Sequence, residues 1–235
     1  SLLRREKLGY QFGEEKKLIN HLLFMDDLKL YARDKEDLGK LLEVVRVFSR
    51  DIRMEFGLDK CAMVEVKAGR QVVCEGIDLP DGQRIKEVDE DGYRYLGVLE
   101  GASFKNKEMK ELVRNEYLRR VRRVARSRLN GGNLITAVNV WAVSVVRYTA
   151  GVLDWNATDL KKMDIKTRKL LTLNGAFNMR SNKDRLYMKR KVGGRGLISV
   201  EECVRAEEKG SREYVMDSDE WMLKVVANGM VAGES

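Results

Sequence analysis

Two adjacent carboxylates, Asp26 and Asp27, are the side chains whose type and spacing best suit chemistry. Apolar residues alternate on both sides of the pair; they are Leu22, Phe24, Leu28 and Leu30. This alternation predicts two short strands joined by a hairpin turn at the aspartates. Mg²⁺ prefers oxygen ligands, takes one or two carboxylates from a protein and leaves other positions for phosphates. The pair therefore suits phosphoryl or nucleotidyl transfer.

A purely structural role for the aspartates is the alternative. Aspartate is a common turn residue, and two of them keep the tip of a hairpin soluble. A turn that serves solubility alone has no need of the apolar run at residues 22–25 directly before the acids. Functional carboxylates often lie at such an apolar edge, so the flanking sequence favours the metal site.

The first hundred residues must supply the sheet that positions this hairpin. Asp34, with Asp37 three residues later, indicates a helix start, and apolar residues recur at helical spacing over residues 38–52. We expect Gly57 to end this helix. Short strands are predicted at residues 61–66, 72–74, 77–79, 84–88 and 93–98. This part of the chain is therefore predicted to be mixed α and β, with mostly antiparallel pairing.

From Phe104 onward the apolar period is helical, and the Asn-Gly-Gly-Asn segment at residues 130–133 separates two long helices. The first helix has an apolar stripe made of Met109, Val113, Tyr117, Val121 and Val124. The opposite side carries Arg119, Arg122, Arg123 and Arg126. Such an arginine stripe suits a phosphate backbone. An ordinary solvated face is the alternative, but it would normally mix glutamate and lysine among the arginines.

Two later segments add positive charge. A third helix, predicted over residues 158–173, has a lysine-rich face, and residues 189–196 form a basic, glycine-rich loop whose backbone is suited to approach phosphates. This loop matches no nucleotide-binding fingerprint. From about Met216 the sequence shows little periodicity, and we expect a mobile tail.

Composition restricts the class of protein. The 235 residues are 43% hydrophobic with a formal net charge of +8, which predicts a globular chain attracted to polyanions and favours nucleic acid over a membrane. The longest apolar stretch, residues 134–153, is interrupted by polar residues, so we expect a buried helix there. Three widely spaced cysteines indicate a reducing, intracellular compartment. With His21 as the only histidine and no paired cysteines, zinc fingers and knuckles are excluded within this chain, and His/Ser and His/Cys triads are nearly excluded.

Three segments follow one another in an informative order. The turn Phe24-Met25-Asp26-Asp27 is followed by a helix, then by residues 56–61 (Phe-Gly-Leu-Asp-Lys-Cys), then by residues 95–97 (Tyr-Leu-Gly). This order resembles the reverse transcriptases of non-LTR retrotransposons, the long interspersed elements. The double aspartate is similar to the metal-binding motif of that family, and the Tyr-Leu-Gly segment is similar to its primer grip. Residues 105–173 resemble the thumb, and residues 193–197 resemble a segment found beyond it.

The resemblance implies two-metal nucleotidyl transfer, with two Mg²⁺ ions, deoxynucleoside triphosphates, an RNA template and a DNA primer. It makes Asp26 the direct metal ligand, Asp27 its supporting partner and Lys60 the residue that neutralises or protonates the leaving pyrophosphate. The primer terminus would be positioned by Tyr95, Leu96 and Gly97. From the residues alone, Lys60 is equally a surface lysine before a strand, and the Tyr-Leu-Gly segment is equally a strand end with glycine at a bend. The family implies a location in the nucleus and cytoplasm.

The expected fold class is α+β. Residues 1–103 would form a partial polymerase palm, an antiparallel sheet with a packed helix; residues 104–175 an all-helical thumb; and residues 176–235 a basic loop, a helix and a mobile tail. The family places a further metal-binding aspartate upstream, whereas the eighteen residues before Ile19 contain none. We therefore expect the chain to begin inside a longer reading frame, to lack the fingers and to be inactive as an isolated chain.

Two other classes of function stay open. A noncatalytic basic module derived from a retroelement would bind RNA or DNA in a salt-sensitive way that survives the loss of Asp26. A metal-dependent nuclease built on the same acids would hydrolyse a strand without added nucleotides. The nuclease does not account for the likeness to a primer grip.

Overall fold

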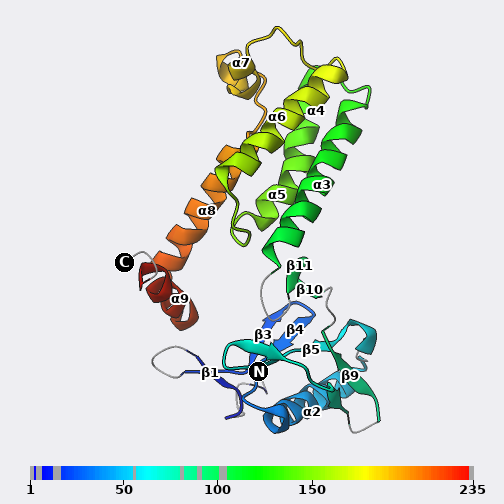
Figure 1. The fold of residues 1–235 in the computed structure, drawn as a ribbon, viewed down its shortest axis with the longest axis vertical. Helices are drawn as coiled ribbons and strands as arrows, with labels where there is room; N and C mark the ends of the chain where they lie inside the picture. The colour runs from blue at the N-terminus through cyan, green and yellow to red at the C-terminus, as the bar shows by residue number, and fades with distance from the viewer. Residues whose placement is uncertain are drawn as a thin grey trace. The chain divides into compact units, whose positions relative to one another are not determined.

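The computed structural model describes residue 3 and residues 7–12, 17–54, 57–79, 82–88, 92–100 and 105–232. The chain divides into two compact units, residues 1–105 and residues 106–235. Figure 1 shows strands and one long helix in the first unit and a group of long helices in the second. The α+β class predicted from the sequence is confirmed.

Strands of the first unit pair mostly as antiparallel hairpins, as predicted. The hairpins are β1 (Tyr10–Phe12) with β2 (Lys17–Ile19), β3 (His21–Phe24) with β4 (Asp27–Leu30), β6 (Glu65–Lys67) with β7 (Arg70–Val72), and β10 (Tyr93–Tyr95) with β11 (Val98–Glu100). A three-stranded sheet has the order β5 (Ala62–Met63), β9 (Arg84–Glu87), β8 (Ile77–Asp78), with β5 parallel to β9. The hairpin of β1 and β2 was not predicted.

Two predicted strands are wrong in their extent. Residues 61–66 do not form one strand, because β5 pairs with β9 whereas β6 pairs with β7. Residues 93–98 are not one strand either, because Leu96 and Gly97 adopt φ values of 47° and 77° and turn the chain back on itself. Positive φ at both central positions is what a tight two-residue hairpin requires.

Helix α2 (Lys35–Asp51) supports the hairpin of β3 and β4. Its start is the predicted one, because the Asp34 carboxylate accepts a hydrogen bond of 2.8 Å from the amide of Asp37. Leu41 and Val45 of α2 pack with Leu28 and Leu30 of the hairpin. Leu42 packs with the core of the three-stranded sheet. The predicted stop at Gly57 is wrong: α2 ends at Asp51, and Gly57 precedes a 3₁₀ turn, η1 (Leu58–Lys60).

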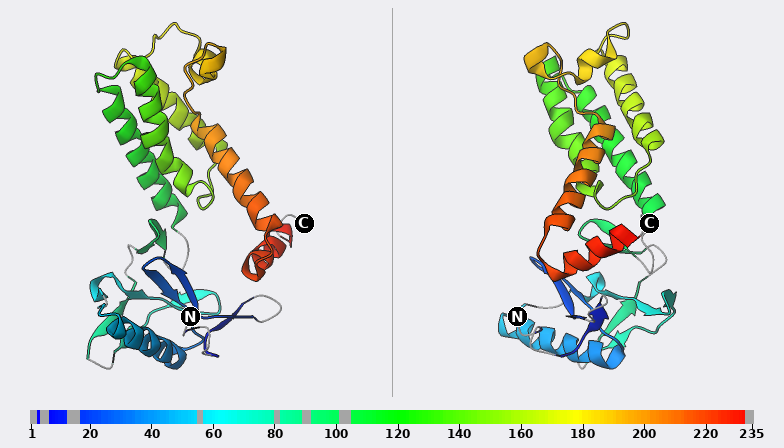
Figure 2. Two further views of the ribbon diagram at one scale, coloured as in Figure 1. Left: turned by 180° about the vertical axis from the view of Figure 1, so that it is seen from behind. Right: turned by 90° about the vertical axis from the view of Figure 1, so that its left-hand side faces the viewer.

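The second unit contains a bundle of four helical rods. They are α3 (Asn106–Ala125), the continuous run of α4 (Gly131–Ala137), η2 (Val138–Ala142) and α5 (Val143–Thr149), then α6 (Ala157–Leu173) and α8 (Val200–Asp217). Helix α3 packs on α5 and α6, and α8 packs on the same two helices, an arrangement that can be followed in Figures 1 and 2. The short α7 (Lys183–Tyr187) and η3 (Arg190–Val192) connect α6 to α8.

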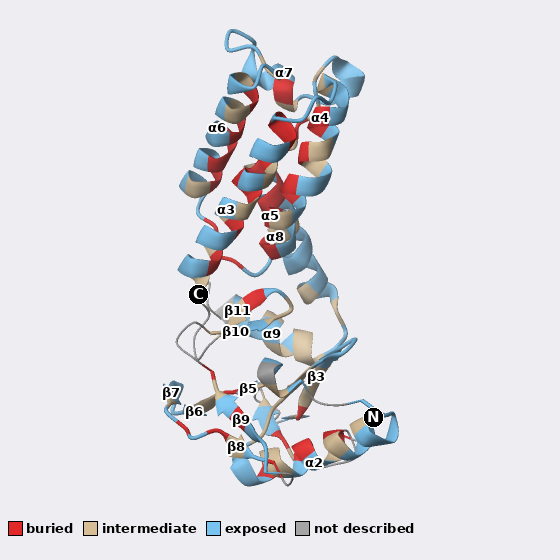
Figure 3. Cartoon of the chain, turned by 90° about the vertical axis from the view of Figure 1, so that its right-hand side faces the viewer, coloured by how far each residue is buried: buried red, intermediate tan, exposed pale blue. Residues whose placement is uncertain are grey.

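The bundle core is the one that the apolar stripes predict. All five residues of the predicted α3 stripe are buried, and Figure 3 shows the buried residues on the facing sides of the helices. Within the core, the hydroxyl groups of Tyr117 and Thr167 share a hydrogen bond of 2.8 Å that joins α3 to α6. The buried carboxylate of Asp164 on α6 accepts hydrogen bonds from the Val200 amide at 2.9 Å and the Ser199 hydroxyl at 2.8 Å, which caps α8.

The expectation of little organisation after about Met216 is wrong. Helix α8 continues to Asp217, and a further helix, α9 (Trp221–Ala232), follows it. Helix α9 is rich in apolar residues without a clean polar side, so its sequence lacks the period that reveals an amphipathic helix. No helix in the described part of the chain combines the length and the apolar character needed to cross a lipid bilayer. Cys74 and Cys203 are buried, Cys61 is half-buried, and none of the three forms a disulfide.

Candidate functional site

The predicted hairpin carries the aspartate pair at its tip. Met25 and Asp26 form the two-residue turn, and Asp27 begins β4 opposite Phe24. Met25 has a φ of 56°, in the left-handed region that non-glycine residues rarely occupy. Both carboxylates are exposed, and no described residue donates a hydrogen bond to either of them or forms an ion pair with them. The acids are therefore presented to solvent and open to an incoming ligand.

A second hairpin, β10 with β11, is held against the first by Lys29. The ammonium of Lys29, on β4, forms a hydrogen-bonded ion pair with the Glu100 carboxylate on β11. The same ammonium lies 5.1 Å from the ring centre of Tyr95 and 5.8 Å from that of Tyr31. Both distances fall within the range of cation–π attraction. The structure therefore brings Tyr95, a predicted primer-grip residue, beside the hairpin of the aspartates.

The electrostatics of the two hairpins are coupled. Partial burial raises the pKa of the Tyr93 phenol, and the negative charge of Asp27 acts in the same direction. Partial burial also raises the pKa of Tyr95, while the positive charge of Lys29 opposes that rise. Burial opposes the charged form of Lys29, but the hydrogen bond from Lys29 to Glu100 and nearby negative groups leave its pKa raised. Asp27 is thus close enough to influence both tyrosines of β10.

The other predicted residues of this unit are placed as follows. Leu96 and Gly97 form the turn between β10 and β11. Lys60 is exposed at the end of η1, and no contact joins it to Asp26 or Asp27 among the described residues. Phe56, which opens the second motif, lies outside the described residues. The role of Lys60 therefore stays a prediction.

The aspartate pair suits a hard cation by its chemistry, because carboxylate oxygens are the ligands that Mg²⁺ prefers. The described residues, however, contain no group of three or more histidine, cysteine, aspartate or glutamate side chains placed to hold a metal ion. Two adjacent carboxylates without an opposing third are too few to hold the two ions of a polymerase centre. Within the described residues, the donor set is therefore smaller than two Mg²⁺ ions need.

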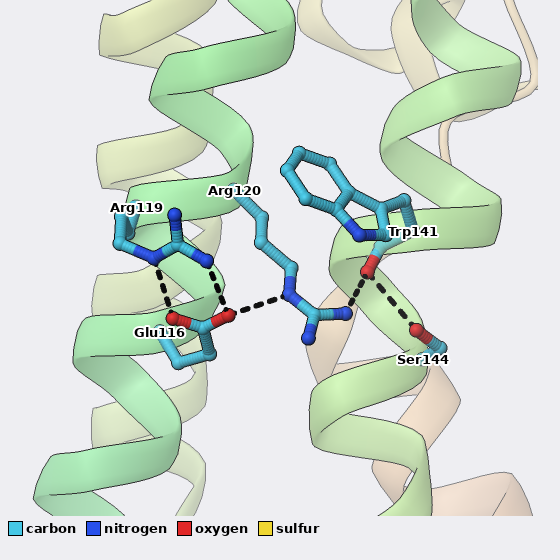
Figure 4. Close-up of polar contacts among 5 residues, drawn as sticks. All are labelled: Glu116, Arg119, Arg120, Trp141 and Ser144. Carbon is cyan, nitrogen blue, oxygen red and sulfur yellow. Dashed lines mark hydrogen bonds and ion pairs between the residues drawn. The ribbon is translucent and has the colours of Figure 1, made fainter.

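Three of the four predicted arginines, Arg119, Arg122 and Arg123, lie on the exposed side of α3, opposite its buried side, and Arg126 directly follows the helix, with its amide donating to the Arg122 carbonyl at 3.2 Å. They occupy positions i, i+3, i+4 and i+7, which share one helix face. Arg119 binds Glu116 through two hydrogen bonds of 2.6 and 2.7 Å, and Arg120 donates to the same carboxylate at 2.7 Å (Figure 4). These hydrogen bonds hold the pKa of Glu116 at about 2, well below its ordinary value.

The other three arginines of the stripe are not neutralised. Arg122, Arg123 and Arg126 are exposed, and no described carboxylate lies within ion-pair distance of any of them. Exposed, unpaired guanidinium groups are available for bidentate contact with phosphates. These three arginines are the strongest candidate for a polyanion-binding surface among the described residues of the second unit.

The glycine amides of the loop at residues 189–196 are bonded within the chain, although the sequence predicts a backbone suited to approach phosphates. The amides of Gly193 and Gly194 donate to the carbonyl oxygens of Arg190 and Lys189, each at 3.1 Å, and the amide of Gly196 donates to the Met188 carbonyl at 2.9 Å. On η2, the Asn139 side chain donates to the Gly196 carbonyl at 2.7 Å and fixes the loop to the bundle. The glycines therefore serve packing, because a Cβ at Gly194 would overlap with the Met188 carbonyl.

Sequence reasoning missed two groups of residues. Lys29 lies between Leu28 and Leu30, which face inward on β4. This alternation could have predicted that Lys29 lies on the other side of the hairpin. Arg120 lies next to the arginine stripe and contacts Trp141 on η2. The seven-residue spacing of Trp141 and Tyr148, which places both on one side of a helix, was the signal for that surface.

Comparison of the chain with models of known protein families and with curated protein sequences finds no match.

Proposed function

We propose that this chain is the palm-and-thumb portion of an RNA-directed DNA polymerase of the non-LTR retrotransposon type, with an RNA template and a DNA primer as its partners. The observation that carries the proposal is the contact between the two hairpins of the first unit. Asp26 and Asp27 are more than sixty residues away from Tyr95 along the chain, yet Lys29 ties their hairpins together through Glu100 and the Tyr95 ring. A polymerase needs such proximity, because the primer terminus must reach the metal-binding carboxylates.

Each part has a role in this proposal. Asp26 would be the direct Mg²⁺ ligand and Asp27 its partner, and the ion would stabilise charge on the phosphates when bound. The turn of Tyr95, Leu96 and Gly97 would position the primer, and the exposed arginines of α3 would hold the phosphate backbone. Because the donor set is incomplete, we expect the isolated chain to bind primer–template without extending the primer.

The test is binding of an RNA–DNA hybrid with a recessed primer 3′ end, compared with a blunt hybrid of the same sequence. Fluorescence anisotropy at several salt concentrations should show tighter binding to the recessed end, with affinity for both falling as salt rises. Tyr95→Ala should abolish the preference for the recessed end. Tyr10→Ala, which removes an exposed tyrosine of the same unit, should leave the preference intact. Equal affinity of the unchanged chain for the two hybrids would refute the polymerase proposal.

Primer extension with Mg²⁺ and deoxynucleoside triphosphates completes the test. No incorporation is expected from the isolated chain. Incorporation that Asp26→Asn abolishes and Asp51→Asn, at the exposed end of α2, leaves unchanged would support the polymerase but overturn the predicted inactivity. Hydrolysis of a labelled strand without nucleotides, lost in Asp26→Asn, would favour a nuclease.

A noncatalytic nucleic-acid-binding module is the second candidate. The unpaired Arg122, Arg123 and Arg126, together with the incomplete carboxylate set, favour it. It predicts salt-dependent binding that is indifferent to the primer end and to Tyr95→Ala, so the hybrid comparison separates the two candidates.

A further inference from the structure

A row of aromatic and apolar side chains lies exposed on the bundle, beside the arginine stripe. Trp141 is 37% exposed and Tyr148 is 64% exposed, and Val152, four residues further on, is 52% exposed. A spacing of seven residues places Trp141 and Tyr148 on one side of the helical run of η2 and α5, and Val152 lies in the turn that follows α5. Single exposed apolar residues are common on protein surfaces, whereas two exposed aromatic rings on one side of a helix indicate a binding surface.

Trp141 is fixed in place by α3. The guanidinium carbon of Arg120 lies 5.2 Å from the centre of the indole, and Arg120 also donates a hydrogen bond of 2.8 Å to the Trp141 carbonyl oxygen. The hydroxyl of Ser144 donates to the same carbonyl at 3.0 Å. Figure 4 shows the indole extending from its helix toward α3, beside Arg120. Its exposed part is therefore presented to a ligand at little further cost in conformational entropy.

The segment that carries Trp141 is a π-helix, residues 138–142, within an otherwise α-helical rod. Such segments are rare and are frequently found at functional sites. Here the same segment supplies Asn139, which binds the loop before α8, and Trp141, which faces the surface. The change from α-helix to π-helix thus occurs at Trp141, a side chain that lies at the surface and is not only part of the core.

Contacts connect the indole to the arginine stripe without a break. Arg120 contacts Trp141 and shares the carboxylate of Glu116 with Arg119. Arg119 is the first residue of the stripe whose other members are Arg122, Arg123 and Arg126. Glu116 is the one acid in this set of five arginines and one glutamate, so it balances only one of the five positive charges. The surface therefore combines net positive charge with aromatic rings.

We infer that this surface of α3, η2 and α5 binds unpaired nucleotides of a nucleic-acid strand, with a base stacked on Trp141 and phosphates on the arginines of α3. Positive grooves with aromatic side chains are how proteins bind single strands without sequence preference, because every base has a π-face. A protein partner would find the same exposed rings, but it offers no reason for three neighbouring arginines without carboxylate partners. The inference rests on the proposed function only in assigning the strand to a template or primer.

The experiment compares three fluorescently labelled ligands of equal length at one salt concentration: a single-stranded oligothymidylate, the same strand with abasic sites throughout, and a blunt duplex. Trp141→Ala should weaken binding of the oligothymidylate about tenfold, the loss expected for one stacked base. Binding of the abasic strand and of the duplex should change by less than about twofold, because their contacts are to phosphates. Trp141→Phe keeps an aromatic face and should retain most of the affinity.

The matched control is Tyr214→Ala, which removes a ring of 67% exposure from α8 and should leave all three affinities unchanged. Equal affinity of Trp141→Ala and the unchanged chain for oligothymidylate would overturn the inference and leave the surface to a protein partner. An equal loss for all three ligands, in both Trp141→Ala and Trp141→Phe, would also overturn it. If the chain shows no preference for the recessed end but Trp141→Ala has the expected effects, the polymerase proposal is refuted and the nucleotide-binding surface is supported. If the chain prefers the recessed end but Trp141→Ala has no effect, only the nucleotide-binding surface is refuted.

Discussion

Replacing Lys29 with methionine tests the link on which the polymerase proposal depends. The substitution removes the ammonium that joins the hairpin of the aspartates to the hairpin of Tyr95, and it keeps an unbranched chain of similar length. The two hairpins belong to separate two-stranded sheets with no strand pairing between them. Loss of the ammonium should therefore loosen β10 and β11 selectively.

The magnitude follows from the contacts. The side chains of Lys29 and Glu100 are each 34% exposed, so solvent screening limits their hydrogen-bonded ion pair to about 1 kcal/mol. The cation–π contacts with Tyr95 and Tyr31 add about 0.5 kcal/mol each. The total is about 2 kcal/mol. Lys29→Met should therefore raise the equilibrium constant for opening of the hairpin of β10 and β11 about thirtyfold.

Amide hydrogen exchange of residues 93–100 measures that opening directly. Protection in Lys29→Met should fall by about thirtyfold there, and a double-mutant cycle with Glu100→Gln should give a coupling of about 1 kcal/mol. Because the pKa of Lys29 is raised in the folded chain, its contribution is complete below the ordinary lysine pKa and is lost as the pH rises through the raised value. Lys40→Met, which breaks an exposed pair with Glu36, is the control and should change protection by less than about twofold. A change in Lys29→Met as small as in this control would refute the reasoning.

Three further predictions concern the bundle. Asp164→Ala should lower the free energy of unfolding of the second unit by about 3 kcal/mol in urea titrations, because it leaves the start of α8 without its buried acceptor; a loss below about 1 kcal/mol would contradict this assignment. Gly194→Ala should cost about 1–3 kcal/mol in the same titration, because the added methyl group overlaps with the Met188 carbonyl, and an unchanged midpoint would show that the loop adjusts. The Glu116 carboxyl should titrate at about pH 2 by NMR, so the stability that its two arginine partners provide is present above about pH 4.5 and is lost as the pH falls toward 2; titration near 4.5 would show that these pairs do not persist in solution.

Local patterns in the sequence determined a large part of this fold. The Asp34 cap and the helical spacing after it predict α2, the apolar stripe of α3 is buried as predicted, and the alternation around Asp26 predicts the hairpin. These features depend on periods of 2 and 3.6 residues and on hydrogen bonds over three or four residues, which a sequence displays directly. The predicted ends of elements were wrong at Gly57 and within residues 93–98. In the second case, the residues on both sides of the turn at Leu96 and Gly97 also fit the pattern of one continuous strand.

Only the tertiary structure decided which of these elements meet. The contact of Lys29 with Glu100 and Tyr95 spans about seventy residues, and nothing local specifies it. The same is true of Arg120 on Trp141, which depends on how α3 packs against η2, and of the Asp164 cap on α8. The glycine-rich loop is an example: its sequence suited an approach to phosphates, whereas in the fold its glycine amides bond to the carbonyl oxygens of residues 188–190 and the Gly196 carbonyl accepts from Asn139. The spacing of apolar residues specifies a helix or a strand. Which helices and strands contact one another depends on shape and charge that exist only after these elements have packed.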